Sequence, residues 1–334
     1  MSKIRVVILS LRMAVVVLME ERQVLQSSLG LTESVFPDII KGIVINVQIA
    51  QASIESRLPY RLGLPAWAFP GWRNTYLLDR PSMLASYASV FNAVEGNTTF
   101  YHIPDADTVS TWKEVTDGQE FQFCFKLPRE VTHERRPDMQ MLSRFLERIE
   151  PLSNNLGPFQ LQFPQWAGMA HLRRLKPVFD AVADRHNAVV EVRDPELFKD
   201  PGLLEPLLDY YGFGRVMLDA RALYQGDLHH PDILAAVHEK PDVPVLGTVY
   251  NRLAFVRLIL HPADTDNARW IDQWAVRTVK WLSDGIVPHI MIHCPNNQYC
   301  PMFAERFHRS LMKVCDEPMP DLPAWPVPQQ GSLI

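Results

Sequence analysis

The feature that most limits the fold of this chain is an alternation between two kinds of segment that begins at Leu58. Short apolar runs rich in β-branched or aromatic residues alternate with segments whose apolar residues recur at helical spacing. The eight apolar runs cover residues 61–64, 93–95, 121–126, 159–163, 189–192, 216–219, 255–260 and 290–293. Because these runs are almost continuously apolar, they are typical of parallel strands buried between helices.

Eight strand–helix units over residues 58–316 predict a single (β/α)8 TIM barrel, a fold that takes roughly 250 residues. A doubly wound open sheet is the alternative architecture. The sequence has no Gly-x-Gly-x-x-Gly turn after its first predicted strand and no Walker loop. A nucleotide-binding version of the open sheet therefore has no motif to support it.

The two ends of the chain depart from the alternating pattern. Residues 4–19 are very apolar, but Arg12 interrupts them, no Ala-x-Ala cleavage site follows, and a membrane span needs roughly 20 residues. We therefore predict that residues 1–57 form a poorly ordered N-terminal extension that is neither a signal sequence nor a membrane anchor. Residues 317–334 are rich in proline, which predicts an extended C-terminal tail on the surface.

Charge and cysteine content limit the partners of the protein. The 33 basic residues are balanced by 38 acidic ones, so no overall field gathers nucleic acid or an anionic membrane. A local basic cleft would still be compatible with nucleic acid. The four cysteines form no Cys-x-x-Cys pair and are too few to staple a chain of 334 residues. We therefore expect reduced thiols, a cytoplasmic location, no membrane association and a small-molecule ligand; the oligomeric state does not follow from the sequence.

Polar side chains stand at the ends of most of the predicted strands. The carboxyl ends of barrel strands meet at one mouth, where the active sites of this fold lie. The residues concerned are Glu95, Asn97, Lys126, Gln162, Glu191, Arg193, Asp219, Arg221, Arg257, His293, Asn296 and Asn297. Ion pairs that serve only packing are the alternative interpretation, because charged groups are also buried in pairs for structural reasons.

Glu95 and Glu191 are the leading candidates for catalysis. Two carboxylates in different surroundings can divide acid and base work, one kept neutral by burial and the other kept ionised by a cation. His133 and Asp219 complete the predicted catalytic set, with His133 as a general acid or base. In the alternative interpretation, each glutamate simply pairs with an arginine.

Ligand binding is predicted for the other groups at the strand ends. Lys126, Arg193 and Arg257 would bring three cations to one mouth, which suits a phosphate or carboxylate unless they only neutralise the glutamates. Aromatic faces beside them could line a pocket for sugar rings or bases. The predicted substrate-binding set is Trp67, Asn97, Tyr101, Lys126, Gln162, Arg193, Arg257, His293 and Asn296. The expected ligand is an anionic or sugar-like small molecule.

A divalent metal ion is a third alternative for the same groups. Glu95, His133, Glu191, Asp219 and His293 include the oxygen and nitrogen ligands that such ions take. No short ligand spacing such as His-Glu-x-x-His is present. We therefore predict no cofactor and assign no metal ligand.

Several separated motifs resemble one known family. They cover residues 63–67, 91–101, 121–126, 132–133, 162–164, 190–193, 293–297 and the tail 327–333. In this order they are similar to the motifs of the YecE-like family, a bacterial domain of unknown function (domain of unknown function 72), and to the tail of its enterobacterial members. The resemblance implies a TIM barrel with a polar cleft at the carboxyl ends of the strands, and it implies no established reaction. Cys294 and residues 137–140 depart from the family pattern, and residues 1–57 lie outside it.

Two classes of function follow from these observations. The first is an enzyme, such as a hydrolase, lyase or isomerase, in which Glu95 and Glu191 act as acid and base; a metal-dependent hydrolase or isomerase is a variant of it. The second is a barrel that binds a ligand or regulates without turnover. Carboxylates that face an open pocket would favour chemistry, whereas carboxylates fully paired beneath a sealed mouth would favour a structural role.

Overall fold

The computed structural model describes residues 57–78, 82–237, 240–263 and 267–326. The chain divides into two compact units, residues 1–58 and residues 59–334. The predictions made for residues 1–56 and for residues 327–334 lie outside the described residues. All the described strands and helices belong to the second unit.

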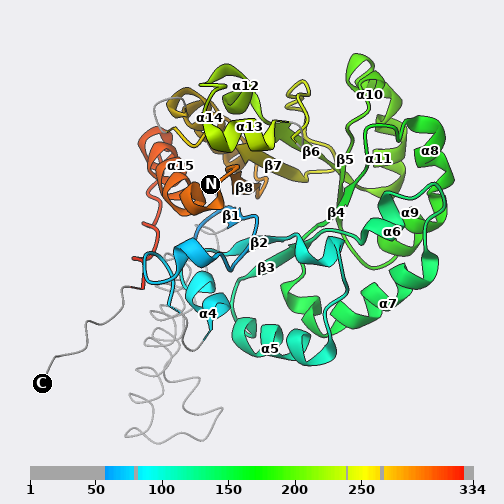
Figure 1. Ribbon diagram of the computed structural model, residues 1–334, viewed down its shortest axis with the longest axis horizontal. Helices are drawn as coiled ribbons and strands as arrows, with labels where there is room; N and C mark the ends of the chain where they lie inside the picture. Colours follow the sequence, from blue (N-terminus) through cyan, green and yellow to red (C-terminus); the bar gives the residue numbers. More distant parts are fainter. Residues whose placement is uncertain (1–56, 79–81, 238–239, 264–266, 327–334) are drawn as a thin grey trace, which may run out of the picture. The chain divides into compact units, whose positions relative to one another are not determined.

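The second unit is built on eight parallel strands (Figure 1). They are β1 Arg61–Leu64, β2 Ala93–Gly96, β3 Gln122–Phe125, β4 Phe159–Gln162, β5 Ala188–Glu191, β6 Gly214–Asp219, β7 Ala254–Ile259 and β8 His289–His293. Their spatial order is β3-β2-β1-β8-β7-β6-β5-β4, so β1 pairs with β8. The predicted TIM barrel is confirmed, and the open doubly wound sheet is wrong, because in that alternative the first and last strands would not pair.

The barrel closes between β3 and β4 through a short seam of backbone hydrogen bonds. The Gly157 amide donates to the Phe123 carbonyl at 3.0 Å, and the Leu127 amide donates to the Gln160 carbonyl at 3.1 Å. Lys126 lies in this seam, where its backbone bridges to Gln160. The end of β3 is therefore held from both sides, by β2 and by β4.

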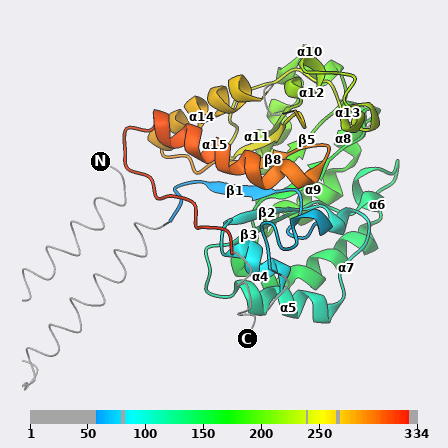
Figure 2. The same cartoon turned by 60° about the vertical axis from the view of Figure 1, so that its left-hand side comes forward.

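Helices cover the outside of the barrel (Figures 1 and 2). Those described are α4 Met83–Ala88, α5 Ala106–Thr116, α6 Arg129–Thr132, α7 Met139–Ile149, α8 Met169–Arg174, α9 Lys176–Ala183, α10 Glu196–Lys199, α11 Glu205–Tyr211, α12 Arg221–Gln225, α13 Pro231–Ala236, α14 Ala268–Ser283 and α15 Cys300–Val314. Local chemistry sets several of their ends. Asp105 caps α5 by accepting the Thr108 amide at 2.7 Å, and Gly212 ends α11 in the left-handed region at φ 67°.

Side-chain alternation along the strands brings polar groups into the lumen of the barrel. One apolar layer contains side chains from six strands, which can meet only inside the barrel: Ala93, Cys124, Val189, Val216, Phe255 and Met291. Successive side chains of a strand point to opposite faces, so residues two positions apart share a face. Two positions beyond five members of this layer stand Glu95, Lys126, Glu191, Arg257 and His293. These five therefore form the next lumen layer, at the carboxyl ends of the strands.

The described part of the C-terminal tail packs against the second unit. Trp325 lies with its ring centroid 5.4 Å from that of Phe91 and 5.0 Å from that of Tyr76. The Pro320 carbonyl is 3.0 Å from Nε2 of His308, whose other ring nitrogen bonds the Tyr60 hydroxyl. Residues 317–326 therefore follow the surface beside α15 without forming a helix or a strand.

We expect a chain that begins at Leu58 to fold without residues 1–57. The physical reason is that the eight strands and the layers of the lumen are complete within residues 59–334. The measurement is thermal melting of the shortened chain, followed by circular dichroism, beside the full chain. A cooperative transition within a few degrees of that of the full chain is the expected result, and a non-cooperative melt would place residues 1–57 in the core.

Candidate functional site

A network of buried ion pairs crosses the lumen at the carboxyl ends of the strands. Arg257, on β7, donates from Nε to Oε2 and from Nη2 to Oε1 of Glu95, both at 2.9 Å. Its third nitrogen, Nη1, donates to Oε2 of Glu191 at 2.6 Å. The exposed fractions are 5% for Arg257, 0% for Glu95 and 1% for Glu191. One guanidinium thus binds two carboxylates from opposite parts of the barrel in planar, charge-assisted geometry.

Two further side chains complete the pairing of the carboxylates. Arg193 donates from Nε to Oε1 of Glu191 at 2.9 Å, and its Nη2 lies 2.8 Å from the same oxygen. His293 places Nε2 at 2.9 Å from Oε2 of Glu95. Since an ionised carboxylate only accepts, Nε2 of His293 carries the proton of this hydrogen bond. Both carboxylates are therefore fully engaged.

The network keeps its carboxylates ionised and its histidine neutral. Burial opposes ionisation of Glu191, but Arg257, Arg193 and Lys126 outweigh it and bring the pKa to about 2. Burial likewise opposes ionisation of Glu95, whose pKa Arg257 and His293 hold well below the usual range. For His293, burial is the largest influence and lowers the pKa to about 4 despite the nearby Glu95. Two anions thus face three cations, Arg257, Arg193 and Lys126.

Lys126 differs from the two arginines of the network. Its side chain is buried, with 7% of the residue exposed, and Nζ lies 5.4 Å from the centroid of the Phe100 ring. Among the described residues, no hydrogen bond from Nζ is formed. Burial, followed by the charge of Arg257, lowers the pKa of Lys126 to about 8. The amine is thus a desolvated cation that loses its proton at a lower pH than an ordinary lysine does.

A cavity of about 400 Å³ opens above the network. Its walls include Lys126, Arg193, Arg257 and His293, whereas Glu95 and Glu191 do not line it. The complete lining is Pro65, Asn97, Phe100, Tyr101, Lys126, Gln162, Arg193, Lys240, Pro241, Arg257, Ile259, His293, Cys294, Pro295 and Asn297. The cations therefore face the cavity while the carboxylates lie behind them.

Gln162 adds an unused acceptor to the same wall. Only 6% of this residue is exposed, and its Oε1 has no hydrogen-bond partner among the described residues. It ends β4 in register with Glu191, which places both on the lumen side of the sheet. A buried carbonyl oxygen without a partner is costly, so it indicates a position that a ligand or a water molecule satisfies.

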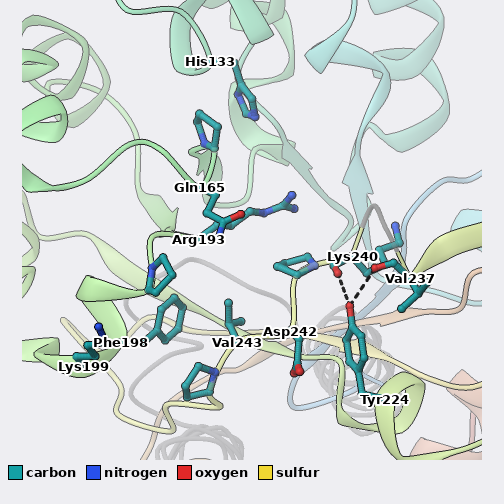
Figure 3. Close-up of a pocket in the computed structure, with 14 residues that line it drawn as sticks. His133, Gln165, Arg193, Phe198, Lys199, Tyr224, Val237, Lys240, Asp242 and Val243 are labelled. Atoms are coloured by element: carbon teal, nitrogen blue, oxygen red, sulfur yellow. Dashed lines mark hydrogen bonds between the residues drawn. The ribbon is translucent and has the colours of Figure 1, made fainter. Parts of the chain in front are cut away.

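A second hollow of about 760 Å³ adjoins the first and shares Arg193, Lys240 and Pro241 with it (Figure 3). His133 lies at one side of it and Tyr224 at the other, where the Tyr224 hydroxyl donates to the carbonyls of Val237 and Lys240. The remaining lining is Pro164, Gln165, Pro195, Phe198, Lys199, Asp242, Val243 and Pro244. The Arg193 guanidinium thus lies between a small deep basin and a wider outer one.

Most of the predicted ligand-binding residues line the smaller cavity, whereas the predicted catalytic residue His133 lines the outer hollow. Asn97 lines the smaller cavity and donates from Nδ2 to the Pro65 carbonyl at 2.9 Å, and Tyr101 lines the rim with 74% of its surface exposed. His133 lines only the outer hollow; burial, together with Arg193 and Lys126, lowers its pKa to about 4. It bonds Thr132 Oγ1 through Nδ1 at 2.9 Å.

Asp219 does not join the network. It stands three positions after the lumen residue Val216, so its side chain points toward the helices. Its carboxylate accepts two hydrogen bonds from the Arg221 guanidinium, at 2.9 and 2.7 Å, one from the Arg221 amide at 3.0 Å and one from Trp274 Nε1 of α14 at 2.7 Å. Asp219 does stand at the carboxyl end of β6, but the expectation that its carboxylate faces the ligand space is wrong, because it lines neither cavity and ties β6 to α14.

Trp67 and Asn296 are also placed elsewhere. The Trp67 ring packs edge-on against Trp112, with centroids 4.9 Å apart, and lines neither cavity. Asn296 accepts the Gln298 amide at 3.2 Å and donates to Asp232 Oδ2 at 3.2 Å. Both residues hold loops beside the mouth and do not face the ligand space, which is a correction to the predicted binding set.

Strand-end reasoning missed the wall formed by Val237 and residues 240–244. Lys240 and Pro241 from this segment line both cavities, and Val243 and Pro244 line the outer one. Residues 240–244 follow α13 in the sequence and belong to no described strand or helix, so no periodic pattern marks them. The prolines at 241 and 244 were the one signal in the sequence, since they indicate an extended loop.

The described residues contain no group of three His, Cys, Asp or Glu side chains that could hold a metal ion. These residues therefore offer no ready set of metal ligands. Glu95 and Glu191, which the metal alternative would use, are paired with Arg257 instead. Among the described residues, no helix has both the length and the apolar character needed to cross a bilayer.

Comparison with known proteins agrees with this architecture. The sequence model of the family described as "Protein of unknown function DUF72" matches residues 61–327. The chain belongs to the DUF72 family. The UPF0759 protein YecE of Escherichia coli strain K12 is 31% identical over 278 residues, which cover 81% of this chain and 98% of that protein. YecE of E. coli O157:H7 matches with the same identity and coverage. The resemblance to the YecE-like family is confirmed.

Solved DUF72 structures share the fold. A DUF72 family protein of Enterococcus faecalis V583 superposes with a TM-score of 0.55 at 18% identity, covering 79% of this chain and 98% of that one. A DUF72 family protein of Thermotoga maritima MSB8 gives a TM-score of 0.52 at 17% identity, covering 75% and 98%. At these identities the likeness concerns the barrel alone, and the chemistry of this DUF72 chain rests on its own site.

Proposed function

We propose that this DUF72 protein binds a small anionic molecule in the cavity at the carboxyl ends of the strands. The observation that carries the proposal is the excess of cations at its wall: Lys126, Arg193 and Arg257 line it, and the two carboxylates that partly neutralise them do not. A volume of about 400 Å³ suits a small metabolite. The four free cysteines support a cytoplasmic setting for it.

The two glutamates support binding by orienting the cations. Arg257 is held by three hydrogen bonds and Arg193 by one carboxylate, so neither guanidinium loses much freedom when a ligand arrives. Lys126 has no such partner within the part of the chain that the structure describes, and an anion beside its Nζ would supply one. Acid–base catalysis by Glu95 and Glu191 is less well supported, because both are paired and their pKa values are lowered.

The proposal predicts that small anions raise the melting temperature of the full chain through Lys126. The probes are inorganic phosphate, succinate and 3-phosphoglycerate, none of which carries a reactive carbonyl, with neutral glycerol and potassium chloride of equal ionic strength as controls. A ligand at ~100 times its Kd stabilises by ~2.7 kcal/mol. At ~2–4 °C per kcal/mol for a domain of this size, the expected shift is ~5–10 °C.

Two variants make this experiment specific. Lys126→Met removes the cavity cation without breaking a described hydrogen bond, so the protein should stay folded and lose most of the shift. Lys176→Met removes an exposed lysine on α9 that pairs only with Asp180, and it should keep the shift. An equal shift in the wild type and in Lys126→Met, or none with any anion, would contradict the proposal.

A further inference from the structure

We propose that Lys126 is a nucleophile, and that its amine forms an imine with the carbonyl carbon of an aldehyde or ketone whose anionic group is bound by Arg193. This inference rests on the proposed anion site and adds to it the chemical class of the substrate, a small carbonyl compound with a carboxylate or phosphate. It also assigns to Lys126 a catalytic role in addition to its role in anion binding.

The first support is the position of Nζ. An amine nucleophile needs access to the ligand space and a lone pair that no protein group occupies. Lys126 lines the deep cavity, rests against the Phe100 ring and forms no hydrogen bond with a described residue. Arg257, by contrast, donates three of its five N–H groups to the two carboxylates and has no lone pair with which to attack a carbonyl carbon.

The second support is the charge state of the amine. Only the neutral form of lysine attacks a carbonyl, and an ordinary lysine with a pKa of 10.5 is almost entirely protonated at pH 8. Burial and the nearby Arg257 bring the pKa of Lys126 to about 8, where half of the amine is neutral. Burial beside a cation makes the protonated amine unfavourable whatever the role of Lys126, so the position of Nζ in the cavity is needed beside the charge state.

The third support is rigidity. The Lys126 carbonyl accepts the Thr99 hydroxyl at 2.7 Å, its amide donates to the Gly96 carbonyl at 3.2 Å, and its backbone bridges to Gln160 across the seam. The base of the side chain is thus fixed at the end of a strand. A reacting group held by regular structure keeps its geometry better than one on a loop.

The surrounding groups match the needs of the reaction. Arg193 lies between the two cavities with about a fifth of its side chain exposed, so it can take an anionic group while the carbonyl reaches Lys126. The unpartnered Oε1 of Gln162 can accept a hydrogen bond from the hydroxyl that forms on the former carbonyl carbon. The outer hollow leaves room for the rest of a longer substrate.

The bond changes balance without any oxidant or reductant. The nitrogen lone pair of Lys126 attacks the carbonyl carbon, the π pair moves to oxygen, and a proton passes from nitrogen to that oxygen to give a carbinolamine. A proton from the solvent is then added to the hydroxyl, and the nitrogen lone pair expels it as water to leave a protonated imine. A neutral amine, a carbonyl compound and one proton thus yield a protonated imine and one molecule of water.

Trapping tests the proposal directly. The full chain is incubated with glyoxylate, which carries a carboxylate beside an aldehyde, and with sodium cyanoborohydride, whose hydride reduces the imine carbon. The expected result is one carboxymethyl group per chain, found at Lys126 by peptide mapping. Acetaldehyde, which lacks the anionic group, should label Lys126 on the order of tenfold more slowly, because a charge-assisted hydrogen bond contributes about 1.5–3 kcal/mol.

The pH profile and two variants separate a catalytic amine from an ordinary lysine. Labelling at Lys126 should reach half its maximal rate near pH 8, whereas labelling of exposed lysines keeps rising toward 10.5. Lys126→Met should abolish the single adduct while melting cooperatively. Lys176→Met should keep it, because Lys176 is exposed and paired with Asp180.

Each remaining outcome decides the question. Labelling spread over exposed lysines with none at Lys126, or a profile at Lys126 without a midpoint near pH 8, would overturn the imine proposal. If phosphate or succinate still stabilises the protein through Lys126 in the melting experiment, the anion site stands and only the imine fails. If those anions also have no effect, the proposed function fails as well.

Discussion

Replacing Arg257 with methionine is expected to lower the free energy of unfolding by about 3–5 kcal/mol, or roughly 6–20 °C in melting temperature. Methionine fills much of the same volume, so the loss comes from charge. The change removes two hydrogen bonds to Glu95 and one to Glu191, both of which are buried, and leaves Glu95 with a neutral histidine as its partner. Chemical denaturation of both proteins at pH 7 measures the difference.

Two comparisons identify the cause of that loss. Arg309→Met removes an exposed arginine that pairs with Glu305 along α15, and it should change stability by less than about 1 kcal/mol. Adding Glu95→Gln and Glu191→Gln to Arg257→Met removes the stranded charges and should recover much of the stability, since neutral replacements of buried ion pairs are often tolerated. If Arg257→Met alone is as stable as the wild type, the ion pairs of the lumen network do not contribute to the free energy of unfolding as their geometry indicates.

Acid should destabilise the protein well before ordinary carboxylates are protonated. In the folded state, burial lowers the pKa of His293 to about 4, and burial together with Arg61 lowers the pKa of His289 to about 3. The unfolded chain takes up these protons near pH 6.5, so stability present above 6.5 is lost as the pH falls toward 4. Each histidine contributes at most ~1.4 kcal/mol per pH unit, hence on the order of 3 kcal/mol by pH 4.

The carboxylates extend the same loss to lower pH. The pKa of Glu191 is about 2 in the folded state, against an ordinary value of 4.5, because Arg257 and Arg193 outweigh the effect of burial. Its contribution to stability is therefore present above about pH 4.5 and disappears as the pH falls toward 2. Denaturant titrations at pH 7, 6, 5 and 4 measure the slope. His293→Gln keeps a donor for Glu95 but does not titrate. Between pH 6.5 and 4, its free energy of unfolding should therefore fall less steeply with pH than that of the wild type, by the equivalent of about one proton taken up on unfolding. Equal slopes in the two proteins would mean that His293 is not buried as a neutral group.

Several residues of the site could be placed from the sequence because a strand has a strict period of two. Ala93, Val189 and Phe255 occupy one lumen layer, and the residues two positions further, Glu95, Glu191 and Arg257, form the next. The same count would have excluded Asp219, which stands three positions after Val216 and faces α14. Its prediction failed because the end of a strand was considered without the face on which the side chain lies.

Other parts of the site had no such local signal. Trp67 follows a strand end as the predicted ligands do, yet its ring turns outward onto Trp112 of α5. Lys240 and Pro241 enter the wall from an irregular segment far from the other lining residues in sequence. The course of a loop depends on what it packs against, and no hydrophobic period records that.

The sequence by itself determined the eight strands, their parallel arrangement and the polar groups at their ends, because hydrophobic period and element length are local properties of the chain. Only the tertiary structure decided which charges meet. Arg257 is separated from Glu95 by 162 positions and from Glu191 by 66, and closure of the barrel brings all three together. Closure also set their depth, because the relative register of the strands, which no single segment encodes, leaves the carboxylates behind the wall and Lys126 facing the cavity.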